Sequence, residues 1–321
     1  MGKLFAIGEA LIDFMPSEAG KGIGEVESFM PAVGGAPANV CGAFAKLGGE
    51  SALITQLGDD TFGDKIVSEL QQWKIDCSYV KRTDKAATSL AFVALKENGD
   101  REFFFCRKPG ADMLFSEEDI EAAWFEEGDM LHFCSVSLGD FPMKEAHKKA
   151  ISYAKEKGML ISFDPNLRPA LWTDQSAMIT TVREFLTYAD VVKISDEEMS
   201  QVTGKDTIEE AVAYLFQKNV KLVIYTKGEK GAEAYTREAS AGVSGITVEC
   251  VDTTGAGDGF IGSFLYCLYK DGIGAEELSK VSAEKLREYL TFANWFASRS
   301  VMKKGAIISY PSDGEFTEEI G

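Results

Sequence analysis

The stretch Val251-Asp252-Thr253-Thr254-Gly255-Ala256-Gly257-Asp258-Gly259 leads directly into an apolar run, Phe260–Lys270, that is typical of a helix. Gly255 and Gly257 allow a tight turn in which backbone amides approach a ligand without obstruction by side chains. Amides at the start of a helix, together with the helix dipole, form a site for an anion. The stretch therefore predicts an anion-binding turn that opens a helix.

Asp258 is an unusual residue for a simple phosphate site, because a carboxylate repels phosphate. It fits a general base that takes a proton from an attacking hydroxyl while nearby amides stabilise a transferring phosphoryl group. The alternative is a capping aspartate after a glycine turn. The stretch alone does not separate these two interpretations.

A glycine pair near the N-terminus, Gly34-Gly35, precedes Ala36-Pro37-Ala38-Asn39-Val40 and an alanine-rich helical pattern. Asn39 offers both a donor and an acceptor, as sugar hydroxyls require. The alternative is a glycine turn followed by a helix that starts at proline, and this segment by itself favours that alternative.

The basic, glycine-punctuated segment Tyr225–Ala232 follows a predicted strand. It is a candidate for holding nucleotide phosphates. A plain hairpin or strand-to-helix turn is the alternative, and taken alone the segment favours it.

Short β-rich runs alternate with helical patterns along the chain, which indicates a mostly parallel sheet covered by helices on both faces. In such sheets ligands bind outside the carboxyl ends of the strands. The predicted strands are Leu4–Gly8, Ala52–Leu57, Met130–Cys134, Leu160–Asp164, Val191–Ser195 and Leu222–Thr226. The predicted helices lie near Ala38–Leu47, Phe62–Trp73, Lys144–Lys157, Ala177–Tyr188 and Ile208–Lys218.

One segment breaks this alternation. Two β-like runs, Ser89–Lys96 and Arg101–Arg107, are joined by Glu97-Asn98-Gly99-Asp100, and Asn-Gly is a strong hairpin signal. We interpret the hairpin as part of a lid that pairs with Leu11–Met15 and with the chain before Gly34. An antiparallel extension of the main sheet is the alternative.

Composition narrows the class of protein. The 321 residues fit one large α/β domain or two small ones, and a net charge of −18 disfavours general nucleic-acid binding. The acidity fits either simple solubility or a salty cytoplasm. The six cysteines include no CxxC pair and are expected to be reduced core thiols. The N-terminus shows neither a signal peptide nor a membrane span, so we expect a cytoplasmic protein.

Several common motifs are missing. The sequence has no GxxxxGK[ST] loop, no GxGxxG after a first strand and no GxSxG. These absences disfavour a P-loop enzyme, a dinucleotide-binding site and a serine hydrolase. Of the two histidines, His132 is expected in the core and His147 on a helix surface.

In combination, the Gly34–Gly49 stretch and the Asp252–Asp258 run resemble the two signatures of the ribokinase-like (phosphofructokinase-B type) carbohydrate kinases. The resemblance extends from Phe5 to Pro311. Within that family, Gly8–Phe14, Gly34–Val40 and Asp164–Trp172 are similar to fructokinases, while kinases of 2-keto-3-deoxygluconate share much of the pattern.

The resemblance implies a three-layer α/β/α fold, with a mostly parallel central sheet and a small β-sheet lid. It implies a single kinase domain over residues 1–321, with lid segments at about 9–33 and 86–110. It also implies an ATP-dependent sugar kinase, most similar to a fructokinase, in which Asp258 is the base and the amides of Gly255, Ala256 and Gly257 form an anion hole. The implied sugar-binding residues are Asp13, Gly34, Gly35, Asn39, Arg101, Phe103, Arg107 and Arg168. The implied nucleotide-binding residues are Lys193, Glu198, Lys227, Gly228, Gly231 and Asn294.

Two ions are implied by the resemblance as well. The family's NxxE motif reads Ser195-Asp196-Glu197-Glu198 here, so Glu198 is expected to orient water around magnesium while Ser195 replaces the usual asparagine. The alternative is that these acids form the first turn of a helix. A potassium-like ion is implied beside the anion hole, at Asp252, Thr254, Ser300, Lys303, Gly305 and Ser309.

Rival functions stay open at this point. The same chemistry on 2-keto-3-deoxygluconate, ribose or a nucleoside is the nearest rival, and Arg107 and Arg168 are available for a carboxylate. A sugar or nucleotide sensor on the same fold is a different class, but a sensor needs no base at Asp258. A homodimer through the lid is expected by analogy alone.

Overall fold

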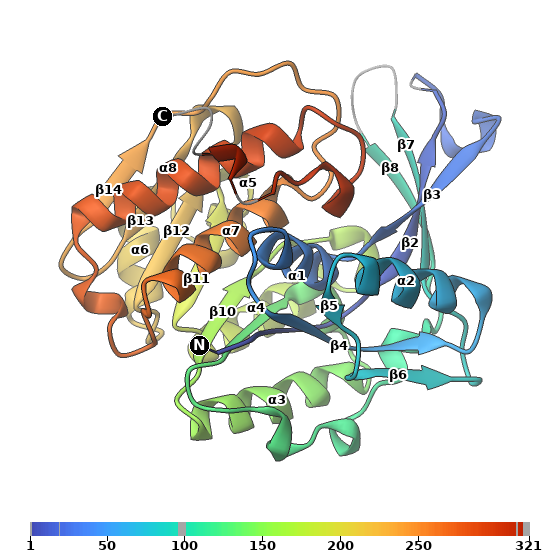
Figure 1. The fold of residues 1–321 in the computed structure, drawn as a ribbon, viewed down its shortest axis with the longest axis horizontal. Helices are drawn as coiled ribbons and strands as arrows, with labels where there is room; N and C mark the ends of the chain where they lie inside the picture. Colours follow the sequence, from blue (N-terminus) through green and yellow to red (C-terminus); the bar gives the residue numbers. More distant parts are fainter. Residues whose placement is uncertain (1, 19, 96–100, 313, 317–321) are drawn as a thin grey trace.

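The computed structural model describes residues 2–18, 20–95, 101–312 and 314–316. Its described strands form two sheets (Figure 1), and their bounds are β1 Leu4–Ile7, β2 Leu11–Pro16, β3 Phe29–Gly34, β4 Ser51–Gly58, β5 Ile75–Asp76, β6 Val80–Thr83, β7 Leu90–Leu95, β8 Arg101–Cys106, β9 Met130–Cys134, β10 Leu160–Asp164, β11 Val191–Ser195, β12 Leu222–Thr226, β13 Ala232–Tyr235 and β14 Ser240–Val243. The predicted turn Glu97-Asn98-Gly99-Asp100 and the side chain of Arg101 lie outside the described part.

The large sheet has the strand order β14-β13-β12-β11-β10-β9-β1-β4-β5, and β6 pairs with β4. The pairs from β12 across to β5 and β6 are parallel, whereas β13 and β14 add antiparallel strands at one edge. The mostly parallel sheet predicted from the alternation is therefore confirmed.

Helices cover both faces of this sheet (Figure 1). Side chains alternate along each strand: Phe5 and Ile7 pack with one helical layer, while Leu4 and Ala6 face the other. The layer against Phe5 holds α3 Met143–Glu156, α4 Gln175–Phe185, α5 Asp196–Thr203 and α6 Ile208–Phe216. The opposite layer holds α1 Ala36–Lys46, α2 Thr61–Gln72, α7 Ala256–Lys270 and α8 Ala283–Ser300.

The small sheet has four described strands in the order β3-β2-β7-β8. β2 pairs with β3 and β7 with β8 in antiparallel fashion, and the parallel pair β2–β7 joins the two hairpins. The hairpin β7–β8 thus pairs with β2 as expected, whereas β3 joins it only through β2, and the alternative of an extension of the main sheet is excluded. The small sheet projects beyond the carboxyl ends of β1 and β4, beside α1 and α2 (Figure 1).

Two expectations about single residues are wrong. His147 is fully buried, because it lies on the face of α3 that packs on the sheet, where its ring nitrogens contact the carbonyls of Met143 and Ile7. All six cysteines are free, but Cys106 and Cys250 are exposed rather than in the core. His132 is buried against the Ser162 hydroxyl at 3.0 Å, as expected.

Within the described residues, no helix is both long and apolar enough to cross a membrane.

Candidate active site

A cleft of about 190 Å³ lies between the small sheet and the carboxyl ends of the main-sheet strands. The small sheet contributes Asp13 and Phe103, and the first turns of α1 and α7 contribute Asn39 and Asp258. The other lining residues used below are Glu9, Gly35, Phe105, Arg107, Asn166, Arg168, Lys193, Thr253, Thr254, Gly255 and Gly257. Segments from both ends of the chain thus meet at one site.

Asp258 lies in the first turn of α7 and is 8% exposed. Its Oδ2 accepts a 2.8 Å hydrogen bond from Nδ2 of Asn39 on α1. Burial raises the pKa of Asp258, although this bond and the charges of Lys193 and Arg168 pull it back. A buried carboxyl held in this way is suited to taking up a proton.

The turn before α7 has the geometry predicted from its glycines. Gly255 has a φ of +73°, a left-handed conformation that glycine adopts without strain. Its carbonyl accepts a 2.7 Å bond from the Tyr310 hydroxyl, while the Ala256 amide donates to the Thr253 carbonyl at 3.2 Å. At Gly257 a methyl group would lie 3.0 Å from Nζ of Lys193, so a cation stands beside the turn.

Asn39 has an acceptor that the protein leaves unused. The side chain is 4% exposed, and among the described residues its Oδ1 has no hydrogen-bond partner. A buried amide oxygen without a partner costs free energy unless a ligand supplies the donor. Since Asn39 lines the cleft, its Oδ1 is suited to accept from a ligand hydroxyl.

Asp13 lies on β2 at the floor of the cleft, opposite Ala32 of β3. A methyl group added at Gly34 would lie only 2.0 Å from Oδ2 of Asp13, so a side chain at position 34 would displace this carboxylate. At Gly35 the φ is +105° and a methyl group would meet the Glu9 carbonyl at 2.5 Å. Burial raises the pKa of Asp13 to about 7, with Arg168 opposing the rise and Asp258 and Glu9 adding to it.

Lys193 on β11 is 6% exposed and forms a 2.8 Å ion pair with Asp164 at the end of β10. Burial would lower the pKa of Lys193, but the charges of Asp164, Glu198 and Asp258 outweigh it and raise that pKa. The fixed cation lies next to the first turn of α7.

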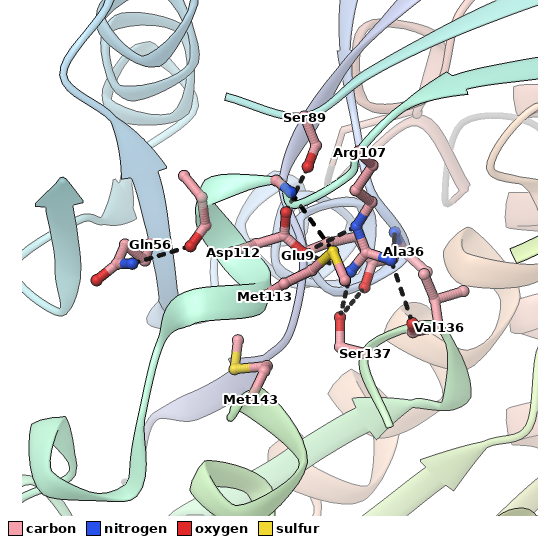
Figure 2. A network of polar contacts seen from close by, with 12 residues as sticks. Glu9, Ala36, Gln56, Ser89, Arg107, Asp112, Met113, Val136, Ser137 and Met143 are labelled. Carbon is pink, nitrogen blue, oxygen red and sulfur yellow. Dashed lines mark hydrogen bonds and ion pairs between the residues drawn. The ribbon is translucent and has the colours of Figure 1, made fainter. Parts of the chain in front are cut away.

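Arg107 follows β8 at the base of the small sheet and is 7% exposed. Its guanidinium is already bound to protein: Nε donates to Asp112 at 3.0 Å, and other donors contact the Val136 carbonyl and the Ser137 hydroxyl (Figure 2). Arg168, in contrast, is exposed and donates to the Leu167 carbonyl.

Of the residues predicted to bind nucleotide, Lys193 lines the cleft, whereas the others are not among its lining residues. Lys227, Gly228 and Gly231 form the turn between β12 and β13, where Gly231 has a φ of +100°. The local alternative of a hairpin turn is therefore structurally right. Asn294 on α8 donates to the Ser244 carbonyl at 2.9 Å, which ties α8 to the chain after β14.

Glu198 performs the local role that the alternative interpretation gave it. It is the third residue of α5, and its Oε2 accepts from the amide and the hydroxyl of Ser195, which caps the helix. Its Oε1 accepts from the Leu167 amide at 2.6 Å, so this carboxylate also fixes the loop that carries Arg168.

The residues predicted to hold a monovalent ion surround the turn before α7. Oδ1 of Asp252 accepts from Thr254 and Oδ2 accepts from the Gly305 amide at 2.9 Å. The hydroxyls of Ser300 and Ser309 are buried, whereas Lys303 is exposed. Among the described residues there is no cluster of three or more His, Cys, Asp or Glu side chains that is arranged to hold a metal ion.

Sequence reasoning did not assign roles to three residues that the structure brings to the site. Glu9 and Asn166 line the cleft, and Asp164 holds Lys193. Asp164 is the last residue of β10, and Glu9 and Asn166 lie two residues after the ends of β1 and β10. Ligands of parallel sheets bind at the carboxyl ends of the strands. Polar residues at strand ends were the signal that could have found them.

Comparison with known proteins shows the family of the chain. Residues 1–313 match the family described as pfkB family carbohydrate kinase. A probable fructokinase-5 of Arabidopsis thaliana is 40% identical over 313 residues, covering 97% of this chain and 95% of that protein.

Solved structures are similar over the full chain. The fructokinase of Vibrio cholerae O395 with fructose, ADP and calcium bound is 33% identical, with a TM-score of 0.88, covering 100% of this chain and 99% of that one. A double mutant of the same enzyme, with fructose, ADP and potassium ion bound, has a TM-score of 0.89 at 33% identity and the same coverage of both chains. A putative ribokinase II of E. coli in complex with ATP and Mg²⁺ is 29% identical, with a TM-score of 0.87, covering 99% of this chain and 98% of that one.

These likenesses confirm the ribokinase-like α/β fold that the resemblance implied. The two signatures found in the sequence also lie together at one cleft, as a shared ligand site requires. The chain belongs to the pfkB family of carbohydrate kinases.

Proposed function

We propose that this protein is a fructokinase, which transfers the γ-phosphoryl group of ATP to D-fructose and forms ADP and D-fructose 6-phosphate. The observation that carries the proposal is the buried pair of Asp258 and Asn39, 2.8 Å apart, in a cleft that Asp13 also lines. The relatives named above support fructose as the acceptor.

The sugar is bound by groups that face the cleft from the small sheet and from the first turn of α1. Asn39 Oδ1 accepts from one sugar hydroxyl and Asp13 from another, while the glycines at 34 and 35 leave room for the carboxylate and the ligand. Phe103 covers the sugar from the small sheet. We assign Arg101 to the same wall from its sequence position alone.

Asp258 then acts as the general base. It takes the proton of the fructose 6-hydroxyl, and the oxygen attacks the γ-phosphorus as the bond to the β-phosphate oxygen breaks. Its raised pKa makes it a stronger base than an exposed aspartate. The amides of Gly255, Ala256 and Gly257, with Lys193 beside them, stabilise charge on the transferring group.

The nucleotide is placed by the opposite end of the site. We assign its phosphates to the turn containing Lys227, Gly228 and Gly231, whose backbone lies next to the main sheet's antiparallel edge. We assign Asn294 to the border of the adenine site. It lies where α8 packs beside β14.

We also propose a site for each of two ions, magnesium and potassium. We propose that Glu198 orients water around magnesium, since its carboxylate binds the loop after β10 that carries Arg168. The ion would neutralise phosphate charge when bound. We assign potassium to the oxygen groups of Asp252, Thr254, Ser300, Lys303, Gly305 and Ser309, because Asp252 already joins this segment to the turn before α7. Potassium there would stiffen the anion-binding turn.

A neutral ketose fits the cleft better than a keto acid does. Arg107, the buried arginine expected to pair with a substrate carboxylate, is bound to Asp112 instead, and the buried Lys193 is bound to Asp164. Glu9, Asp13 and Asp258 also line the cleft and would repel a carboxylate, which leaves Arg168 to oppose them. This observation favours fructose over 2-keto-3-deoxygluconate.

At the scale of the chain, we propose one kinase domain over residues 1–321, with lid segments at about 9–33 and 86–110 that exclude water from the bound sugar. We propose a cytoplasmic location, and a homodimer formed through the small sheet, whose Met30 and Phe104 are 61% and 58% exposed.

The test is a coupled ADP-release assay with ATP, magnesium and potassium against fructose, 2-keto-3-deoxygluconate, ribose, glucose and adenosine. We expect fructose to give the highest kcat/KM. Preference for the keto acid would contradict fructose as the acceptor, but it would not contradict the roles proposed for Asp258 and the anion hole. Absence of release with every acceptor would contradict the proposed fructokinase.

A further inference from the structure

The chain passes between the main sheet and the small sheet four times within the described residues. Glu9 lies on the first passage, between β1 and β2, and Ala36 follows the second, from β3 into α1. Ser89 lies directly before β7 on the third passage, and Arg107 directly after β8 on the fourth. One connected set of buried polar contacts joins all four (Figure 2).

Asp112, in the 3-10 helix after the fourth passage, links two of these segments. Its Oδ1 accepts from the Ser89 hydroxyl, and its Oδ2 accepts from Nε of Arg107 at 3.0 Å and from a second guanidinium nitrogen. Ser89 and Asp112 are each 1% exposed. The hydrogen bond from Ser89 to Asp112 thus fastens the third passage to the fourth, beside the buried ion pair of Arg107 and Asp112.

Ser137, after β9 of the main sheet, continues the set. Its hydroxyl accepts from Arg107 at 3.4 Å and donates to Oε2 of Glu9 at 2.6 Å. Oε1 of Glu9 accepts from the Ala36 amide at 3.3 Å, which reaches the second passage. The contacts therefore run without interruption from Ser89 to Ala36 (Figure 2).

The buried charges of this set depend on a single cation. Asp112 pairs with Arg107 directly, Glu9 is linked to Arg107 through the Ser137 hydroxyl, and burial raises the pKa of Glu9 against the pull of Arg107. Buried charges that lose a partner destabilise strongly, whereas a complete set specifies one arrangement. Such a set is suited to fixing geometry, because small displacements of any passage break a contact.

We propose that Glu9, Ser89, Arg107, Asp112 and Ser137 form a positioning network, which holds the four passages in one geometry and so sets how closely the small sheet faces the sugar. Arg107 then acts through its protein partners rather than by contacting the substrate. The network controls sugar affinity because Asp13, Phe103 and Phe105 reach the cleft only from the small sheet. This inference rests on the proposed sugar kinase activity.

Ser89→Ala is the sharpest probe, because it removes one contact to Asp112 and leaves every charge in place. Ser51→Ala is its matched control: Ser51 is 2% exposed and its hydroxyl donates to the Cys41 carbonyl at 3.0 Å, at the opposite end of the main sheet. We expect Ser89→Ala to raise the KM for the sugar about tenfold, the fold-change of one lost bond to a charged group. The KM for ATP should stay within about twofold, and Ser51→Ala should change neither constant.

A double-mutant cycle tests whether the contacts act as one unit. Ser89 and Ser137 do not bond each other, but Asp112 and Arg107 connect them. We expect the loss of kcat/KM in Ser89→Ala/Ser137→Ala to be at least about threefold smaller than the product of the single losses. The pair Ser51→Ala/Ser137→Ala should lose the product of its single effects.

Arg107→Lys and Arg107→Gln complete the test. Lysine keeps the charge beside Asp112, so it should retain more sugar affinity than glutamine, and it remains informative where the glutamine variant does not fold. Equal sugar KM values for Ser89→Ala and Ser51→Ala, or multiplicative losses in the first cycle, would overturn the network. The cycle is run with whichever sugar the wild type phosphorylates, so failure with fructose counts against the proposed acceptor and not against the network.

Discussion

Asp13 has a carboxyl whose ionisation lowers the stability of the folded state. It faces the cleft from β2 close to Asp258 and Glu9, and its surroundings raise its pKa to about 7 from an ordinary value of 3.8. Below about pH 4 the group is protonated in both the folded and the unfolded state. Between about pH 4 and pH 7 the folded state holds the proton more tightly, so the stability that this group contributes is lost as pH rises toward 7.

We predict that Asp13→Asn makes the protein more stable and less able to bind sugar. The gain in melting temperature over wild type should be larger at pH 8 than at pH 5, because only the wild type must bury an ionised carboxylate at pH 8. The KM for fructose should rise about tenfold or more at pH 8, since a carboxylate acceptor is lost. Thermal unfolding at both pH values and steady-state kinetics measure these effects. An equal difference in melting temperature between Asp13→Asn and wild type at both pH values would contradict the raised pKa of Asp13.

At the scale of elements, the close approach of α1 to α7 brings together Asn39 and Asp258, the pair proposed to act in catalysis. Gly262 of α7 lies against α1, where an added methyl group would be 2.7 Å from Cβ of Ala43 and 2.9 Å from the Val40 carbonyl. This close packing brings Asn39 to within 2.8 Å of Asp258. Gly262 is therefore part of the site without touching the cleft.

We predict that Gly262→Ala destabilises the protein, although glycine to alanine in a helix ordinarily stabilises by about 1 kcal/mol. Overpacking costs about 1–3 kcal/mol, and the separation of the helices should also lower kcat. Ala43→Gly in the same chain should restore part of both losses, because it removes the nearer contact. Denaturant unfolding and kinetics measure this; a Gly262→Ala variant more stable than wild type would show that the helices have room to spare.

The sequence was informative about elements whose signals are local. Strand-to-helix alternation and Asn-Gly predicted the parallel strands β9 to β12 and the hairpin β7–β8. The antiparallel edge β13–β14 was missed because Ser240-Ala241-Gly242-Val243 has little strand propensity and is held by its neighbour. His147 was misplaced because lysines surround it, although its spacing from Met143 and Ile151 puts it on the buried face.

The glycine turns of the candidate site and the cleft position of Asp258 were predictable from the sequence, whereas the contacts that connect the site were less so. The pairing of Lys193 with Asp164 depends on how the neighbouring strands β11 and β10 end beside each other, and the pairing of Arg107 with Asp112 depends on how the chain turns after β8. No spacing in the sequence records those contacts. The sequence therefore offered Arg107 as a substrate ligand, while the structure places its guanidinium among protein acceptors.

At the scale of the whole molecule, the cleft is lined by residues of the small sheet and by residues at the strand ends of the main sheet, so a bound sugar would contact both. A ligand that binds only the folded state stabilises it by about 2.7 kcal/mol at a hundred times its Kd. We predict that fructose raises the melting temperature, and that glucose at the same concentration raises it less. Differential scanning fluorimetry of the wild type measures both shifts; equal shifts from the two sugars would argue against a fructose-specific cleft.

The most direct test of the central claim is the turnover of Asp258→Asn with fructose and ATP. The side chain keeps its shape and its place beside Asn39 but can no longer accept a proton. We predict that kcat falls by about 10²–10⁴-fold while the KM for ATP stays close to that of wild type. Near-full turnover with fructose in Asp258→Asn would contradict the assignment of Asp258 as the base.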